Sequence, residues 1–202
     1  MSKTPIRIVL FYLLCAILIA AVAGATFLRI NYSKPPLPPI KPVPAFQLVE
    51  RSGKQISLAD LKGKVLLVDF VYSECPGPCP MISTRFSDLQ KEVLKDPNAL
   101  MISITLNPAH DTVEVLKAYA ERFHASPDRW LFLTGEKSKV LDLVVNGFMM
   151  TVLEQNDQKQ PIIHSTKIAL VDKQGTIRAY FDAGDEKNQP EILKAIQQLS
   201  RE

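Results

Sequence analysis

Two cysteines lie close together in the segment Cys75-Pro-Gly-Pro-Cys79, directly after a dense apolar run. A cysteine thiolate is both the nucleophile of disulfide exchange and a soft metal ligand. The run and the residues that follow predict a strand that hands over to a helix. The positive end of that helix favours thiolate over thiol, so at least one of the two sulfurs should have a lowered pKa.

The spacing of the pair leaves three uses open. The three intervening residues form a wider and stiffer loop than the two-residue spacing of dithiol oxidoreductases, and two soft sulfurs on one loop suit Cu(I). A redox-active pair remains possible. A structural disulfide is the weakest use, because a bridge across so short a loop removes little chain entropy.

Two ligands alone would leave a metal ion exposed, so a third ligand should come from elsewhere. The sequence offers His110, His124 and His164. His124 falls at the end of a predicted helix and is most simply a solvated or capping residue. His164 precedes a predicted strand, but a lone histidine is more often a residue without a ligand. On the residues alone the third ligand therefore stays open.

The elements that would position these residues alternate between strand and helix. The run 65–72 (VLLVDFVY) is typical of a strand covered on both faces in a parallel sheet. We predict further strands at 100–106 and 130–133 and helices after the cysteines and at 113–123, 138–148 and 190–199. Hairpins are expected at 46–50 with 55–58 and at 167–171 with 176–181. The pattern predicts an α/β fold with a mixed central sheet, flanking helices and an N-terminal hairpin.

An apolar segment precedes this domain. Residues 8–28 carry no charge and are about long enough to cross a bilayer as a single transmembrane helix. Lys3 and Arg7 stand before it, so the positive-inside rule leaves the N-terminus in the cytoplasm and the domain in the periplasm or otherwise outside the cytoplasmic membrane. The alternative is a signal peptide, cleaved near residues 21–25, and a secreted domain. Within a transmembrane helix, Cys15 is a small hydrophobic residue that faces lipid.

We therefore divide the chain into residues 1–30 (cytoplasmic tip and anchor), 31–45 (proline-rich linker) and 46–202 (one domain). The formal net charge of +3 is too small for a nucleic-acid footprint, so we exclude nucleic acid as a partner. With three cysteines, one of them in the apolar segment, a disulfide scaffold of the small secreted type is also excluded.

Three segments together resemble the Sco/SenC family of copper-binding assembly factors: FVYSECPGPCP at 70–80, ISITLNPAHDTVEVLKAYAERF at 102–123 and HSTKIALVDKQG at 164–175. The likeness runs from about Phe46 to the C-terminus and also covers the anchor. It implies a thioredoxin-like fold in which Cys75, Cys79 and His164 bind one copper ion. It further implies delivery of that copper to the dinuclear copper A site of cytochrome c oxidase subunit II, with a copper donor or thiol reductant upstream.

Asp111 matches an aspartate of the family that is expected to support partner docking or local structure, although it could equally cap the helix 113–123. Two positions depart from the family pattern, because Asn107 and Ile163 stand where acidic residues are usual. The missing charges bear on the strength of copper binding and on the docking surface, and they leave the three ligands unchanged. His110 is not part of the family's metal set.

Three functions follow as hypotheses. The first is a copper metallochaperone, because two sulfurs and an imidazole suit Cu(I) and can also hold Cu(II). The second is a thiol:disulfide oxidoreductase that uses Cys75 and Cys79 without metal on the cysteines of the oxidase subunit or of other exported proteins. The third, a peroxidase, finds no particular support in the double-proline loop.

Overall fold

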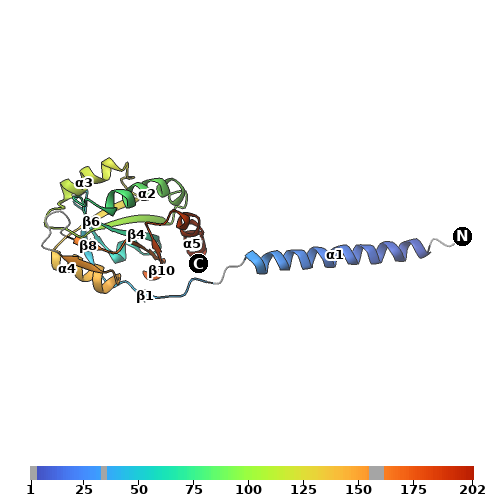
Figure 1. Cartoon of the computed structure of the whole chain (residues 1–202). Coiled ribbons are helices and arrows are strands. Elements are labelled where there is room, and N and C mark those ends of the chain that lie inside the picture. The colour runs from blue at the N-terminus through green and yellow to red at the C-terminus, as the bar shows by residue number, and fades with distance from the viewer. Residues whose placement is uncertain (1–3, 33–35, 155–161) are drawn as a thin grey trace. The chain divides into compact units, whose positions relative to one another are not determined.

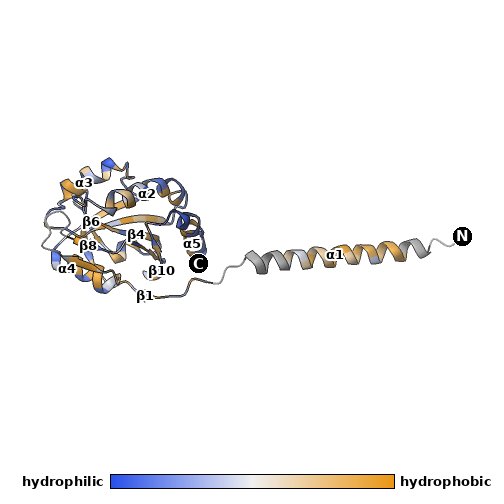
Figure 2. Ribbon diagram, in the orientation of Figure 1, coloured by the Kyte–Doolittle hydropathy of each residue, from blue (hydrophilic) through white to orange (hydrophobic). Residues whose placement is uncertain are grey.

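The computed structural model describes residues 4–32, 36–154 and 162–202. The chain divides into two compact units, Met1–Pro36 and Leu37–Glu202. The first unit holds one helix, α1 (Thr4–Tyr32). Its segment Ile8–Thr26 has a mean hydropathy of 2.8 and no buried residues, and most of its ribbon has the orange of hydrophobic residues in Figure 2. Length and composition make α1 a candidate transmembrane span, although a signal sequence would have the same properties.

The second unit is built on an eight-stranded sheet in the order β1-β10-β9-β4-β5-β6-β2-β3. The strands are β1 (Lys41–Pro42), β2 (Gln47–Glu50), β3 (Gln55–Ser57), β4 (Val65–Val71), β5 (Ala99–Thr105), β6 (Trp130–Thr134), β9 (Lys167–Val171) and β10 (Thr176–Asp182). The neighbours β4, β5 and β6 are parallel, whereas the other pairs are antiparallel. Every residue of β4 and β5 is buried, as the continuous apolar runs predict for central parallel strands.

Helices cover both faces of this sheet (Figure 1). Between the parallel strands run α2 (Pro78–Val93) and α3 (Val113–Arg122), which are tied by a hydrogen bond between the Ser83 and Tyr119 hydroxyls. The C-terminal α5 (Gln189–Arg201) packs against α2 and β4. On the opposite face lies α4 (Lys137–Asp142), and the ring of Phe148 that follows it meets Phe70 edge-on at 5.3 Å. Short 3₁₀ turns span Leu58–Leu61 and Glu186–Asn188.

The predicted mixed sheet, flanking helices and both hairpins are confirmed. The turn between β9 and β10 depends on Gly175, whose φ of +86° is left-handed and suits glycine. One predicted helix differs, because 138–148 is a short α-helix that continues as the π-helix Leu143–Gly147. A second, two-stranded sheet was not predicted: β7 (Val152–Glu154) pairs with β8 (Ile162–His164).

The expected linker ends earlier than the sequence suggested. Residues 33–35 lie outside the described residues, but the chain from Leu37 onward belongs to the second unit. The Leu37 carbonyl accepts hydrogen bonds from the Arg178 guanidinium, β1 pairs with β10, and Val43 is buried. Proline is tolerated in β1 because this strand forms the sheet edge, where a missing amide donor costs little. The second compact unit thus includes residues 37–45 of the predicted linker.

Candidate metal centre

Both cysteines lie in the connection between the central strand β4 and the helix α2. Cys75 is 6% exposed and Cys79 is fully buried, and neither is in a disulfide. Cys79 falls in the first turn of α2, between two prolines, where the backbone amides have no intrahelical partner and proline is tolerated. The amide of Cys75 donates to the Tyr72 carbonyl at 3.2 Å, which turns the loop back over the strand end. The loop thus holds two free thiols at the carboxyl edge of the sheet.

His164 reaches the pair from the end of β8, whose partner β7 places Val152 opposite it. The ring atom Nε2 lies 3.3 Å from the Cys79 Sγ. The other ring nitrogen, Nδ1, lies 2.9 Å from the Ser165 carbonyl oxygen. Because a carbonyl only accepts, Nδ1 carries the hydrogen, and the Nε2 lone pair faces the sulfurs. A hydrogen bond from the ring nitrogen that does not bind the metal commonly fixes the tautomer of a metal-ligating histidine.

The ligand atoms of Cys75, Cys79 and His164 all lie within 4.8 Å of one another. The three residues that the resemblance singled out are therefore brought together, although His164 is 85 positions from Cys79 in the chain. No other group of three or more such side chains with this geometry occurs among the described residues. Two sulfurs and an imidazole around one point form a possible site for a soft or borderline metal ion.

The two thiols share one proton. A hydrogen bond from the Cys79 thiol lowers the pKa of Cys75 to about 4, and nearby backbone amides act in the same direction against the effect of burial. The same interaction, together with burial, raises the pKa of Cys79. One thiolate and one thiol therefore coexist at neutral pH. The sequence predicted one lowered pKa, but the main cause is the partner thiol and not the end of the helix.

Tyr72 supports the histidine and was missed by sequence reasoning. Its buried hydroxyl donates to the Ile162 carbonyl at 3.2 Å, and its ring meets the imidazole of His164 edge-on with centroids 6.0 Å apart. The contact joins the end of β4 to the start of β8. Nothing local in the sequence signals it, because the two residues that are hydrogen-bonded lie 90 positions apart.

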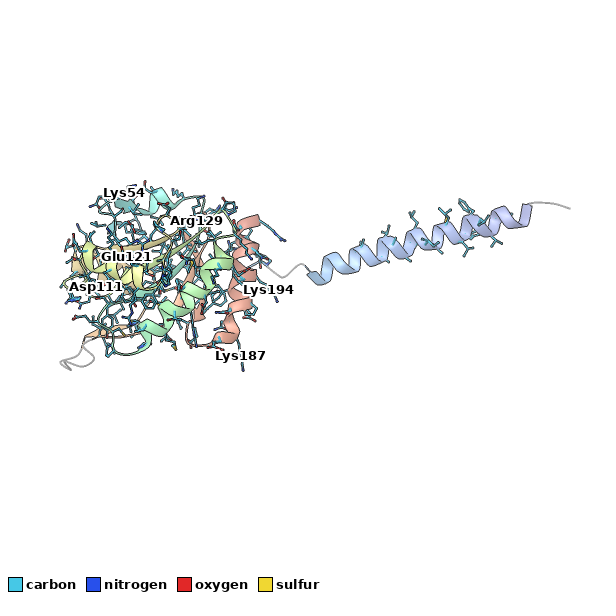
Figure 3. All side chains as sticks on the ribbon, turned by 90° about the horizontal axis from the view of Figure 1, so that it is seen from above. Lys54, Asp111, Glu121, Arg129, Lys187 and Lys194 are labelled. Atoms are coloured by element: carbon cyan, nitrogen blue, oxygen red, sulfur yellow. The ribbon has the colours of Figure 1, made fainter. Side chains whose placement is uncertain are left out.

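Asp111 supports the start of the cysteine loop through hydrogen bonds. Its fully buried carboxylate accepts from the Ser73 amide at 3.1 Å and from the hydroxyls of Ser73 and Thr105. Figure 3 labels Asp111 beside α3. Burial argues against the docking role expected for this residue, and the helix cap is Thr112, whose side chain accepts from the Val115 amide. Local support is the role that the contacts favour.

The remaining candidate positions lie outside the cluster. His110 is hydrogen-bonded through Nδ1 to Asp111 at 3.1 Å, and its Nε2 lies 3.4 Å from a Glu74 oxygen. His124 is exposed in the left-handed region at the end of α3, with φ of +52°, which agrees with its predicted solvated role. Asn107 opens the turn before α3, since its carbonyl accepts from the His110 and Asp111 amides. The side chain of Ile163 lies outside the described residues.

Comparison with known proteins gives concordant matches. The SCO1/SenC family model matches residues 37–201. The SCO1 protein homolog of Bacillus subtilis (strain 168) is 28% identical over 160 residues, which cover 78% of this chain and 82% of that protein. The family-model match covers the second unit up to residue 201, and both cysteines and His164 lie within it.

Solved structures of related proteins share the fold. BsSco, described as a member of the Sco family of cytochrome c oxidase assembly proteins with a disulfide switch, superposes with a TM-score of 0.73 at 26% identity, covering 82% of this chain and 98% of that one. Bradyrhizobium japonicum ScoI with copper bound gives a TM-score of 0.64 at 24% identity, covering 79% and 98%. The second unit thus has the thioredoxin-like architecture of these proteins.

Proposed function

Because the chain belongs to the SCO1/SenC family, we propose that it is a copper metallochaperone that binds one copper ion through Cys75, Cys79 and His164. The observation that carries this proposal is the convergence of the three ligand atoms within 4.8 Å. The relative from Bradyrhizobium japonicum, which has copper bound, shares this fold and supports the choice of metal.

The donor set suits copper in either oxidation state. Two thiolates and one imidazole satisfy Cu(I), which prefers soft ligands, and the imidazole also makes Cu(II) acceptable. Cys75 is already a thiolate at neutral pH, so one sulfur is ready to bind, whereas Cys79 gives up a proton on binding. A disulfide between the two would remove both sulfur ligands, so copper is loaded only onto the reduced pair.

The destination that we propose is the dinuclear copper A site of cytochrome c oxidase subunit II. Support comes from BsSco, which is described as a member of a family of cytochrome c oxidase assembly proteins. A copper donor or a thiol reductant must act upstream, since the site needs both metal and reduced sulfurs. α1 would hold the protein in the cytoplasmic membrane with its N-terminus inside and the metal centre in the periplasm, unless it is removed as a signal peptide.

Copper binding is tested by titrating the reduced full chain with Cu(I) in detergent, under a competing chelator, in a Cys15→Ser background that leaves only the paired thiols. We expect one equivalent to bind, and His164→Ala to weaken binding by more than about tenfold, that is by about 1.4 kcal/mol or more. His124→Asn is the matched control, because it removes an exposed histidine at a left-handed position that asparagine tolerates. Unchanged affinity in His164→Ala would refute the three-ligand site.

A second candidate is a thiol:disulfide oxidoreductase, which the shared proton of the cysteine pair favours. The lowered pKa of Cys75 provides the attacking thiolate, and Cys79 stands ready to resolve a mixed disulfide. In this case Cys79→Ser would trap a covalent complex with the partner through Cys75, while His164→Ala would leave exchange rates intact. Loss of exchange in His164→Ala would instead tie the thiol chemistry to the metal centre.

A further inference from the structure

The helix that carries Cys79 also carries a mostly buried cation. Arg85 lies further along α2, next to the buried Phe86, and its side chain is only 17% exposed. One nitrogen of its guanidinium donates to the Ala183 carbonyl, and another lies 3.3 Å from a carboxylate oxygen of Glu186. Both partners belong to the loop that follows β10. Arg85 therefore ties α2 to that loop through a charged donor, and charged donors form the stronger hydrogen bonds.

The two contacts of Arg85 differ in weight. The Glu186 side chain is 80% exposed, and an ion pair with so exposed a partner contributes little to stability. Ala183 is only 5% exposed, so its carbonyl would be left with a poor substitute in water if the guanidinium were removed. The hydrogen bond to the Ala183 carbonyl is therefore the contact that holds the loop.

The loop in turn holds the segment that contains His164. The Ala183 amide donates to the Thr166 carbonyl at 3.0 Å, and the Thr166 hydroxyl donates to an Asp182 oxygen at 3.0 Å. Thr166 lies just beyond His164 in the chain. A path of hydrogen bonds therefore leads from α2, through Arg85 and Ala183, to the residues beside His164.

This path completes the support of the histidine. On the side of His164 that precedes it in the chain, the Tyr72 hydroxyl holds the Ile162 carbonyl, whereas Arg85 acts on the side that follows it. Because Cys79 and Arg85 share one helix, a shift of the loop against α2 would change the distance of 3.3 Å between Cys79 Sγ and His164 Nε2. A binding constellation tolerates misplacement of only about 0.5 Å.

We propose that Arg85 is a positioning residue of the metal centre, which fixes the segment after His164 against the helix that carries Cys79. The inference rests on the proposed three-ligand site, because it gives Arg85 the role of presenting one ligand to the other two. Arg85 does not itself bind the metal, since a guanidinium has no lone pair to offer. Its effect reaches the centre only through the loop.

Amide hydrogen exchange of the reduced full chain tests this path without metal. The variant is Arg85→Met, which keeps a long unbranched side chain and removes the charged donor. We expect the protection factor of the Ala183 amide to fall by at least about fivefold, because the carbonyl of the same residue loses its donor. The Met101 amide in β5 should be unaffected. Unchanged exchange at Ala183, or an equal loss at Met101, would overturn the proposal.

Glu186→Gln is the matched control. It removes the exposed carboxylate that faces Arg85 but keeps the donor to the Ala183 carbonyl. Protection of the Ala183 amide should therefore equal that of the wild type. An equal loss in Glu186→Gln and Arg85→Met would assign the effect to the exposed ion pair and would contradict the role given to the buried carbonyl.

The second readout is Cu(I) affinity of the full chain in the Cys15→Ser background, measured under a competing chelator. Arg85→Met should weaken binding by at least about threefold, because His164 is presented for a smaller fraction of the time. In a His164→Ala background the same substitution should have no further effect. Unchanged affinity in the first background, or an additive loss in the second, would rule out a positioning role.

The two readouts separate this proposal from the proposed function. If the chain binds no Cu(I) at all, the three-ligand site fails. The exchange of the Ala183 amide still decides whether Arg85 holds the loop, because that measurement needs no metal. Conversely, a copper site that forms with full affinity in Arg85→Met would leave the proposed function intact and remove the role of Arg85.

Discussion

Removing the Tyr72 hydroxyl should loosen the hairpin that carries His164 without touching any ligand. Tyr72→Phe keeps the ring that contacts the imidazole and deletes only the hydrogen bond to the Ile162 carbonyl. That carbonyl then loses its buried donor. The net value of such a bond is about 1 kcal/mol, and an acceptor left unsatisfied raises the cost toward about 2 kcal/mol. Because β7 and β8 pair only with each other within the described residues, we expect the cost to fall on local opening of this hairpin.

Native-state hydrogen exchange measures this directly. The reporter is the Ser165 amide, which donates to the Thr151 carbonyl at the base of the hairpin, and the reference is the Met101 amide in β5. A loss of about 1 kcal/mol corresponds to about a fivefold lower protection factor at Ser165. Met101 should be unaffected. Unchanged protection at Ser165, or an equal loss at both amides, would refute the view that Tyr72 acts as a local support of the hairpin.

The same variant also has a metal readout. Tyr72→Phe should weaken Cu(I) binding in the wild-type background, because a less firmly held hairpin presents His164 for a smaller fraction of the time. In a His164→Ala background the substitution should have no further effect, since the ligand that the hairpin presents is absent. An additive loss in the double variant would show that Tyr72 acts through another route.

Three further predictions concern stability. Asp111→Ala should lower the free energy of unfolding in urea by about 2–4 kcal/mol, because the Ser73 amide and the Thr105 hydroxyl lose a charged acceptor. The control Asp88→Ala, at an exposed position, should change it by less than about 0.5 kcal/mol. Asp111 and Glu74 raise the pKa of His110, so the stabilising contribution of this histidine should be present below about pH 6.5 and disappear as pH rises through the raised folded-state pKa. Unfolding of wild type and His110→Asn at several pH values tests this. A wild-type advantage that grows with pH would contradict it. A chain that begins at Phe46 should lose at least about 2 kcal/mol of unfolding free energy relative to one that begins at Leu37, because the burial of Val43 and the pairing of β1 are lost. Unfolding of both chains in urea measures this, and equal stability would show that residues 37–45 add nothing to the fold.

Local patterns were sufficient for most of the fold. The apolar runs 65–72 and 100–106 and the helical spacing between them depend only on neighbouring residues, so the central parallel strands and their helices were predicted nearly to the residue. The pairing of Lys41–Pro42 with β10 was not predicted, because proline content reports backbone preference and not tertiary contacts. The hairpin of β7 and β8 was missed, since each of its strands has only three residues and so gives too short a pattern to recognise.

The sequence by itself determined which atoms are available: two cysteines at a strand-to-helix junction and a histidine before a strand, in a family pattern that named all three. Only the tertiary structure decided how these atoms act. It alone brings His164 Nε2 to 3.3 Å from Cys79 Sγ and buries Asp111 as a support of the cysteine loop. The physical reason is that convergence, burial and proton sharing depend on contacts between residues distant in the chain, which residue types and local spacing do not encode.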